Sequence, residues 1–312
     1  MVNEGGPGSL SEDELSGVLR HLQPVGVLSG GFVSDVPWVS GGAVGGELKV
    51  VAVLRGSARL ATDGGLSARL GAGDVALLSG RSWLTLRGGA GRRAPREIAP
   101  PTGWSGQGSA PDGAGDVVVG GHLGLGVAGR ELLRAALPPL SRLPGSAPGA
   151  HRLRSVLGLL LAEFVDGGPG SRFAAEQYAR LVLLEAVRAL VAGAALPPGW
   201  LRLLADERLR PAVRLIHEQP GRSWRLAQLA RAAAMSRTTF ADRFRRTGGC
   251  TPFGYLHRWR VVLAEHALRH TDTTVDALAG QLGYASPGAF STAFRRTVGM
   301  PPGAYRRAHT GR

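Results

Sequence analysis

The sequence has little of several things, and each scarcity excludes a class of protein. It holds a single cysteine, Cys250, among 312 residues, which excludes a framework of intramolecular disulfides. No apolar run approaches the ~20 residues that a helix needs to span a bilayer. The Gly-rich, acidic first residues, Met1–Glu14, differ from a secretory signal. We therefore expect a cytoplasmic protein without a membrane partner.

Acidic residues are scarce in only one part of the chain. Residues 1–207 carry 19 basic and 18 acidic side chains, a net charge of +1. Residues 208–312 carry 18 basic and 5 acidic side chains, a net charge of +13, and every basic residue there is Arg. A localised basic domain is typical of a protein that binds a polyanion. The alternative is a solvated basic surface without such a partner.

Glycine is abundant, with 48 residues, and from Val25 to about Leu86 it separates short apolar segments. Short strands joined by glycine turns predict a small antiparallel barrel or sandwich. The predicted strands are Leu48–Leu54, Ala58–Ala61, Leu66–Leu70, Val75–Leu78, Trp83–Leu86 and Val117–Val119. Gly88–Gly115, rich in Gly, Pro, Ala and Arg, is interpreted as a long loop.

Apolar residues at helical spacing predict helices at Glu14–Leu22, His151–Phe164 and Phe173–Val191. The last two have two interpretations: they pack on the preceding β-rich domain, or they form a dimerisation element. The chain therefore divides into a disordered N-terminus (1–13), a β-rich domain (14–137), a helical linker that includes the possible dimerisation element (138–205) and a basic helical domain (206–312).

The basic domain repeats itself at a spacing of 50 residues. Ser236–Tyr255 aligns with Ser286–Tyr305 without a gap, and nine of the twenty positions are identical. The identical pairs are Ser236/Ser286, Phe240/Phe290, Phe244/Phe294, Arg245/Arg295, Arg246/Arg296, Thr247/Thr297, Gly249/Gly299, Pro252/Pro302 and Tyr255/Tyr305. The domain is therefore two copies of one supersecondary unit.

Each copy has the pattern of a helix-turn-helix. A short apolar helix, Leu226–Ala233 or Val275–Leu282, precedes a turn of three or four residues, and a serine at the N-cap opens the next helix. In that helix two Phe residues four apart face inward, an Arg pair suits the negative helix end, and Gly249 or Gly299 follows. The second helix would present small polar side chains to DNA, with Arg for the phosphates.

A repeat of helical hairpins that binds another protein is the alternative. The net charge of +13 and the presence of only two copies, too few for a solenoid, favour double-stranded DNA. A connecting helix, Tyr255–Ala267, would hold the two copies about one DNA turn (~34 Å) apart. His266 and His270 are four residues apart and suit zinc, but no third ligand is evident, so we expect no metal.

Residues from about Arg208 to Arg307 resemble the AraC/XylS DNA-binding domain along its whole length. The matching segments are Trp224–Arg231, Met235–Phe240, Arg243–Arg246, Thr251–Leu256, Trp259–Arg260, Val275–Ala279, Leu282–Tyr284, Phe290–Arg296 and Gly299–Arg307. The resemblance implies an all-α double helix-turn-helix domain whose second helices enter adjacent major grooves of a direct-repeat-like promoter site. In this family such binding usually activates transcription through contact with RNA polymerase.

The resemblance also implies the DNA-binding residues, position by position. The set is Ser236, Arg237, Thr238, Thr239, Ala241, Asp242, Arg245 and Arg246 in the first copy, and Ser286, Pro287, Gly288, Ser291, Thr292, Arg295 and Arg296 in the second. The residues that open each helix would read bases, and the Arg pairs would contact phosphates. Because Pro287 and Gly288 have no side-chain donor, we expect the second copy to act mainly as a phosphate clamp.

The N-terminal region resembles, over fewer residues, the cupin-type sensor of one AraC subgroup. The matching segments are Pro37–Trp38, Val53–Ser57, Gly71–Asp74 and Leu137–Pro139. The two resemblances together imply an α+β protein: an N-terminal antiparallel β-barrel, a helical linker and a C-terminal double helix-turn-helix domain. Metal cupins use histidines on neighbouring strands, whereas the corresponding places here hold Val51 and Trp83. We therefore expect no metal, no other cofactor and no catalytic residue.

The sequence thus predicts a DNA-binding transcription regulator, an activator rather than an enzyme. An unidentified signal, such as a small-molecule effector, would act on its sensor domain, and it would form a homodimer. Two alternatives stay open. Stoichiometric Fe, Mn or Zn in the purified protein would favour a cupin-type metalloenzyme with a DNA-binding tail. Equal affinity for promoter and random DNA would favour a non-specific architectural protein.

Overall fold

The computed structural model describes residues 12–22, 25–44, 48–91, 93–100, 115–147, 150–192 and 196–309. The chain forms two compact units. We call residues 24–124 and 137–195 the β unit, and residues 1–23, 125–136 and 196–312 the helical unit. The predicted disordered N-terminus falls almost wholly outside the described residues, as does the part of the predicted long loop at 101–114.

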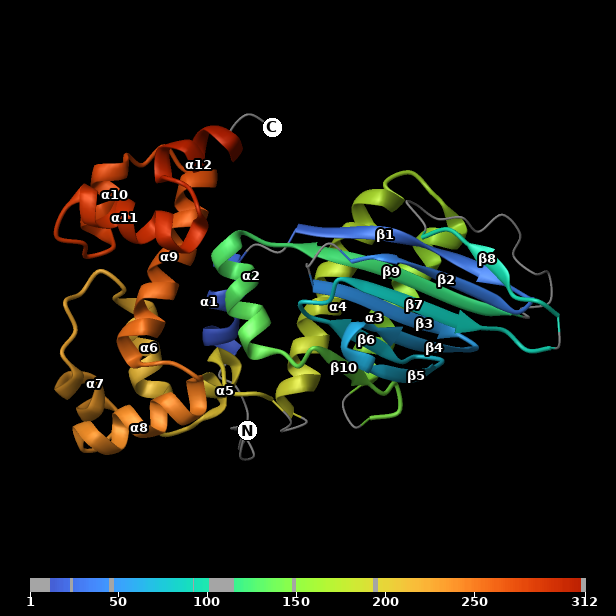
Figure 1. The fold of residues 1–312 in the computed structure, drawn as a ribbon, viewed down its shortest axis with the longest axis horizontal. Coiled ribbons are helices and arrows are strands. Elements are labelled where there is room, and N and C mark those ends of the chain that lie inside the picture. The colour runs from blue at the N-terminus through green and yellow to red at the C-terminus, as the bar shows by residue number, and fades with distance from the viewer. Residues whose placement is uncertain are drawn as a thin grey trace. The chain divides into compact units, whose positions relative to one another are not determined.

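In the described part of the β unit, the strands form two five-stranded sheets (Figure 1). The first sheet has the order β1 (Val25–Ser34), β9 (Asp116–Gly124), β3 (Leu48–Arg55), β6 (Val75–Leu78) and β10 (Leu140–Leu143). The second has the order β5 (Ser67–Gly71), β4 (Ser57–Thr62), β7 (Trp83–Gly88), β2 (Trp38–Ala43) and β8 (Arg96–Ile98). A single 3-10 turn, Asp63–Gly65, joins β4 to β5.

The predicted antiparallel, mixed α+β fold is confirmed; the two sheets are not closed into a barrel and instead face each other across one core. A barrel closes only when every edge strand gains a second neighbour. Within the described ranges, β1, β10, β5 and β8 each pair on one side only, and β8 runs parallel to β2. The apolar faces of the sheets are covered in another way, by each other and by two helices.

Strand β6 illustrates how this covering works, because all four of its residues are apolar and buried. Ala76 and Leu78 belong to the core between the two sheets. Val75 and Leu77 belong to a second core, formed with α3 (His151–Asp166) and α4 (Ser171–Ala192). A continuous apolar run is what a strand buried on both faces requires. The helices α3 and α4 therefore pack on their own sheet, as one of the two interpretations anticipated.

Two segments that carry the cupin resemblance join distant parts of the β unit. The Trp38 indole on β2 donates to the Asp116 carboxylate on β9 at 2.7 Å, which links the two sheets. The same carboxylate accepts the amide of Ser57 at 3.0 Å. Asp74, after β5, accepts the amide of Gly145 at 2.8 Å and pairs with Arg142 at 2.8 Å. These buried carboxylates are satisfied by amides and Arg, as buried charges must be.

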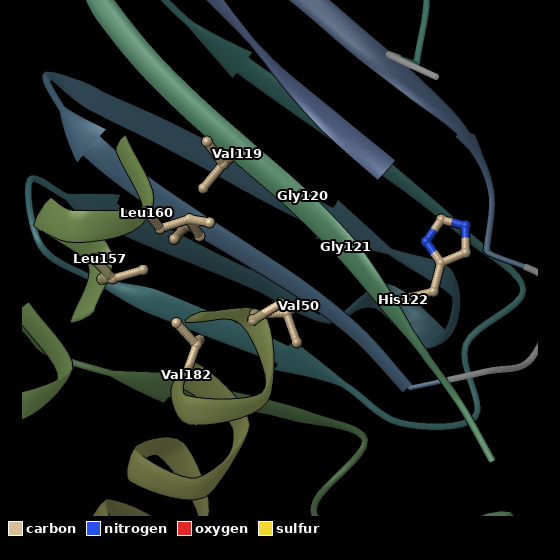
Figure 2. Close-up of a pocket in the computed structure, with 10 residues that line it drawn as sticks. Val50, Val119, Gly120, Gly121, His122, Leu157, Leu160 and Val182 are labelled. Atoms are coloured by element: carbon tan, nitrogen blue, oxygen red, sulfur yellow. The ribbon is translucent and has the colours of Figure 1, made fainter. Parts of the chain in front are cut away.

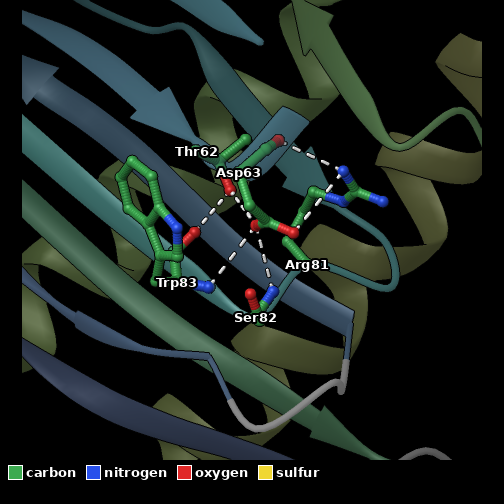
Figure 3. Close-up of polar contacts among 5 residues, drawn as sticks. All are labelled: Thr62, Asp63, Arg81, Ser82 and Trp83. Carbon is green, nitrogen blue, oxygen red and sulfur yellow. Dashed lines mark hydrogen bonds and ion pairs between the residues drawn. The ribbon is translucent and has the colours of Figure 1, made fainter. Parts of the chain in front are cut away.

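A third carboxylate holds the end of the second sheet together (Figure 3). Asp63 follows β4, accepts the amide of Ser82 at 3.1 Å and lies 3.7 Å from the Arg81 guanidinium. The hydroxyl of the preceding Thr62 donates to the carbonyl of Trp83. The turn after β4 and the start of β7 are therefore fixed to each other by polar contacts.

The helical unit is discontinuous in sequence. Its helices are α1 (Glu12–Leu22), α2 (Val127–Ala136), α5 (Trp200–Ala205), α6 (Arg210–Glu218), α7 (Leu226–Ala232), α8 (Arg237–Gly248), α9 (Pro252–His270), α10 (Val275–Gln281), α11 (Pro287–Val298) and α12 (Pro302–His309). Helix α2 lies inside the predicted β-rich domain (14–137) and α1 spans the start of that domain, yet both pack with the C-terminal helices. No helix in the described ranges is both long and apolar enough to cross a membrane.

The internal repeat gives the helical unit two matching aromatic cores. Phe240 and Phe244 are fully buried with ring centroids 5.6 Å apart, and Phe290 and Phe294 are fully buried at 5.7 Å. Each pair continues to the tyrosine that ends its copy of the repeat. The prediction that these phenylalanines face inward is confirmed.

Replacing Phe240 by Ala should lower the free energy of unfolding by ~3–5 kcal/mol, because it leaves a cavity in the first aromatic core. Urea unfolding of the full chain measures this. Phe253→Ala is the matched control, since that side chain is 44% exposed and its loss should change stability by less than ~0.5 kcal/mol. Equal losses in the two variants would contradict the assigned core.

Candidate nucleic-acid interface

Two helix pairs form what we call the first head (α7 and α8) and the second head (α10 and α11). Each head turns at a residue in the left-handed region, Ala234 (φ 51°) in the first and Gly283 (φ 71°) in the second. The next amide closes the turn onto the preceding helix: Met235 onto the carbonyl of Ala230 and Tyr284 onto that of Ala279, both at 2.9 Å. The same turn is thus built twice from different residues.

The second helix of each head begins and ends in the way the repeat predicts. Ser236 caps α8 by accepting the amide of Thr239 at 3.2 Å, and Ser286 caps α11 by accepting that of Ala289 at 3.1 Å. Gly249 ends α8 in the left-handed conformation, and the equivalent glycine ends α11 in the same way. The predicted caps are confirmed.

The predicted DNA-binding residues lie along these two helices with the same exposure in both heads. Thirteen of the fifteen are exposed, and the other two, Ala241 and Ser291, are equivalent positions that are partly buried. The phenylalanine pairs occupy the opposite, buried face. The hydroxyls of Ser236 and Ser286 accept hydrogen bonds from amides in the first turns of their helices. Ser236 Oγ also lies 2.9 Å from Thr239 Oγ1.

Helix α9 joins the two heads. It begins just after α8 and ends just before α10, so the first head lies toward its start and the second toward its end (Figure 1). Its 19 residues span about 28 Å at the rise of an α-helix. The helix is longer at both ends than the predicted Tyr255–Ala267.

Helices α1 and α2, which precede the basic domain in the sequence, pack on α9. The sequence did not predict this packing. The ring of His21, on α1, lies 5.6 Å from Trp259 and 5.5 Å from His266. The carboxylate of Glu265, only 1% exposed, accepts the amide of Ala128 at the start of α2, at 3.0 Å. Burial raises the pKa of Glu265, and the hydrogen bond from the Ala128 amide opposes that effect. No local pattern in the sequence signals either contact.

The β unit holds a small apolar cavity between the first sheet and the helices α3 and α4 (Figure 2). Its volume is about 30 Å³, which leaves room for little more than a water-sized group. The lining residues are Val50, Ala52, Val119, Gly120, Gly121, His122, Leu157, Leu160, Ala179 and Val182. The His122 ring points away from the valines and leucines, and its Nδ1 lies 3.1 Å from the Nζ of Lys49. Burial lowers the pKa of Lys49 to about 8.

The positions where metal cupins carry histidines are unsuited to a metal. Val51 is buried in the core between the sheets, and Trp83 is 43% exposed at the start of β7. Within the residues that the structure describes, no group of three or more His, Cys, Asp or Glu side chains could hold a metal ion.

Comparisons with known proteins agree with this architecture. A cupin family model matches residues 13–192, and a helix-turn-helix domain model matches residues 229–308. A protein of Streptomyces lividans named as an AraC-like transcription regulator is 36% identical over 96% of this chain and 99% of its own. The chain belongs to the AraC-like transcription regulators. It is a DNA-binding regulator with a cupin-like N-terminal domain.

Two further relatives illustrate the range of this family. The RCS-specific transcriptional activator RclR of Escherichia coli is 29% identical to this regulator over 94% of this chain and 97% of its own. The crystal structure of the DNA-binding domain of AdpA in complex with a target DNA is 36% identical, covers 31% of this chain and 91% of that one, and has a TM-score of 0.30. The relatives named here are transcription factors.

The surroundings of α9 give the regulator an acid-sensitive residue. His217, on α6, has its ring 4.5 Å from Trp259, and its Nε2 lies 2.7 Å from the Tyr255 hydroxyl. Burial, and to a lesser extent the nearby His21, lowers the pKa of His217 from 6.5 to about 4. The folded protein therefore holds this ring neutral at pH values where the unfolded chain would protonate it.

His217 should accordingly stabilise the fold fully above pH 6.5 and lose that contribution as the pH falls toward 4. The loss should approach ~3 kcal/mol, since each unit of pKa difference is worth ~1.4 kcal/mol. Urea unfolding between pH 7.5 and 4 measures it. In His217→Gln the free energy of unfolding should fall less steeply between pH 6.5 and pH 4. The same change at the exposed His151 should leave this slope unchanged. If the free energy of unfolding of His217→Gln fell with decreasing pH as steeply as that of the unaltered protein, His217 would not be the acid-sensitive residue.

Proposed function

We propose that this AraC-like regulator binds a directly repeated, non-palindromic promoter site, with α8 and α11 in adjacent major grooves. The observation that carries the proposal is the recurrence of one exposed helix face at the two ends of α9, in a segment with a net charge of +13. An exposed second helix with a buried aromatic face is the geometry with which helix-turn-helix proteins read DNA.

Within each head we assign two roles. In the first head, Arg237, Thr238 and Asp242 lie at or near the start of α8 and would read bases, Arg through guanine and Asp through cytosine. The exposed pairs Arg245/Arg246 and Arg295/Arg296, in the last turns of α8 and α11, would contact phosphates. Pro287 and Gly288 offer no side-chain donors, so the second head would contribute mainly affinity.

We also propose the partners that would make this binding regulatory. The chain would act in the cytoplasm as an activator that contacts RNA polymerase, a role consistent with the name of the Escherichia coli relative. The exposed Leu159, Phe173 and Leu181 on α3 and α4 would form a homodimer contact. An effector, if apolar, would enlarge the cavity under these helices. The protein would act by binding alone, without catalysis, since its relatives are regulators.

The proposal can be tested without knowing the promoter. Sites selected from a randomised DNA pool are first checked for two repeated elements. Their affinity for the full chain is then compared with that of random DNA at one fixed salt concentration. A sequence-specific regulator should prefer the selected site on the order of 10³-fold or more. Equal affinities would instead indicate a non-specific architectural protein.

Arg237→Ala and Arg296→Ala should weaken binding in different ways. The first should cost ~1–3 kcal/mol on the selected site and relax the choice of base there. The second should weaken all sequences alike and lower the slope of log affinity against log salt by about one. Titrations at several salt concentrations measure both. A changed base preference in Arg296→Ala with an unchanged salt slope would show that the two roles are wrongly assigned.

A further inference from the structure

Arg260 lies in the middle of α9 and binds both the loop that leads into the first head and the turn of the second head. Its Nε donates to the carbonyl of Pro220 at 2.7 Å, and its Nη2 donates to that of Arg222 at 3.2 Å. Both carbonyls belong to the loop between α6 and α7, which leads into the first head. Its Nη1 donates to the carbonyl of Gly283 at 3.4 Å, in the turn of the second head. One side chain therefore bridges the loop before the first head and the turn of the second head.

The two segments that Arg260 joins also touch each other directly. A Cβ atom added at Gly221 would lie 2.1 Å from the carbonyl oxygen of Gln281, and one added at Gly283 would lie 2.0 Å from that of Gly221. Such distances leave no space for any side chain, so the two backbones are in contact. The loop that leads into the first head and the turn of the second head thus meet at a glycine junction, in addition to the connection through α9.

The chemistry of Arg260 suits this bridging role better than DNA binding. A guanidinium is planar and carries five N–H donors in a fixed fork, which allows it to hold several carbonyls at once, whereas a lysine ammonium is a single point of charge. The group is partly buried, and it lies 5.5 Å from the ring of Tyr284 in the second head. Arg258, two residues earlier on the same helix, is exposed.

We propose that Arg260, with the Gly221–Gly283 junction, fixes the separation and rotation of the two heads and so sets the spacing that the regulator accepts between its two DNA elements. Arg260 is a positioning residue: it acts through the heads and contacts no base. The inference rests on the proposed binding of a two-element site. A base pair inserted between the elements moves the second one by about 3.4 Å and rotates it by about 34°. Rigidly joined heads cannot follow this change, whereas loosened heads can.

The test uses the full chain and the selected DNA site, together with sites that have one or two base pairs inserted or deleted between the elements. The measured quantity is the ratio of affinities for the preferred and altered spacings. We expect a ratio of roughly tenfold or more for the unaltered protein, as for two modules that cannot engage together. In Arg260→Gln the affinities for the preferred and altered spacings should differ by no more than about threefold, because the loosened heads can bind both elements at either spacing.

Three further variants separate geometry from charge and from folding. Arg260→Lys keeps the charge but not the fork, so it should lose spacing selectivity like Arg260→Gln. Arg258→Gln removes a charge from the same helix and should keep the full spacing ratio. Gly221→Ala forces the junction open while Arg260 stays in place, and it should also lower the ratio. If Arg260→Gln fails to fold, the lysine and Gly221 variants carry the test.

The possible outcomes are distinguishable. If Arg260→Gln, or its substitutes, keep the spacing ratio of the unaltered protein, the positioning role is overturned while the proposed function stands. The same conclusion follows if Arg258→Gln lowers the ratio as much as Arg260→Gln, because charge alone would then explain the effect. If the unaltered protein shows no preference for any selected site, the proposed function itself fails.

Discussion

The helical unit depends on the burial of α9. Nine of its nineteen residues are buried, and they lie on more than one side of the helix. A helix that is apolar around much of its circumference must be covered from several directions. Helices α1, α2, α8, α11 and α12 all pack against it. The positions of both heads follow from this need, because each head is also a part of the cover.

The repeat shows how one architecture tolerates different sequences. The turn of the first head places Ala234 in the left-handed region, where an L-residue is strained, and the second head uses Gly283 at the matching point. The glycine there has a second use, since only a residue without a side chain permits the close contact with Gly221. Duplication thus supplied two similar heads, and the contact between them required residues that differ.

Sequence patterns predicted much of the fold because they report local forces. The strands from β3 to β7 agree with the predicted segments to within one or two residues, since glycine turns bound each apolar run. The caps and aromatic anchors of both heads were also predictable, because the repeat shows each of them twice. Whether the sheets close into a barrel could not be predicted, since alternating apolar strands fit a barrel and a sandwich equally well.

What the sequence could not reveal depends on contacts between distant segments. In the sequence Arg260 is one more cation in a basic domain, and nothing nearby distinguishes it from Arg258. The fold nevertheless directs it to carbonyls in the loop before the first head and in the turn of the second head. Glu265 would be expected to be solvated, yet the fold buries it and places the Ala128 amide of α2 against its carboxylate. The positions of the exposed residues on α8 and α11 could be predicted from the sequence, whereas their contacts with DNA depend on a partner outside the chain.

The packing of α1 and α2 limits how this protein can be divided. The helical unit draws on residues 1–23, 125–136 and 196–312, so no single cut in the chain releases it whole. A recombinant fragment that begins near Leu196 would lose the contacts that His21 and Ala128 make with Trp259 and Glu265 on α9. Such a fragment would be less soluble and less stable than the whole helical unit. It exposes additional apolar surface, and the Glu265 carboxylate loses its hydrogen bond from the Ala128 amide. A useful minimal version must carry both helices, supplied as separate peptides or joined by a designed linker.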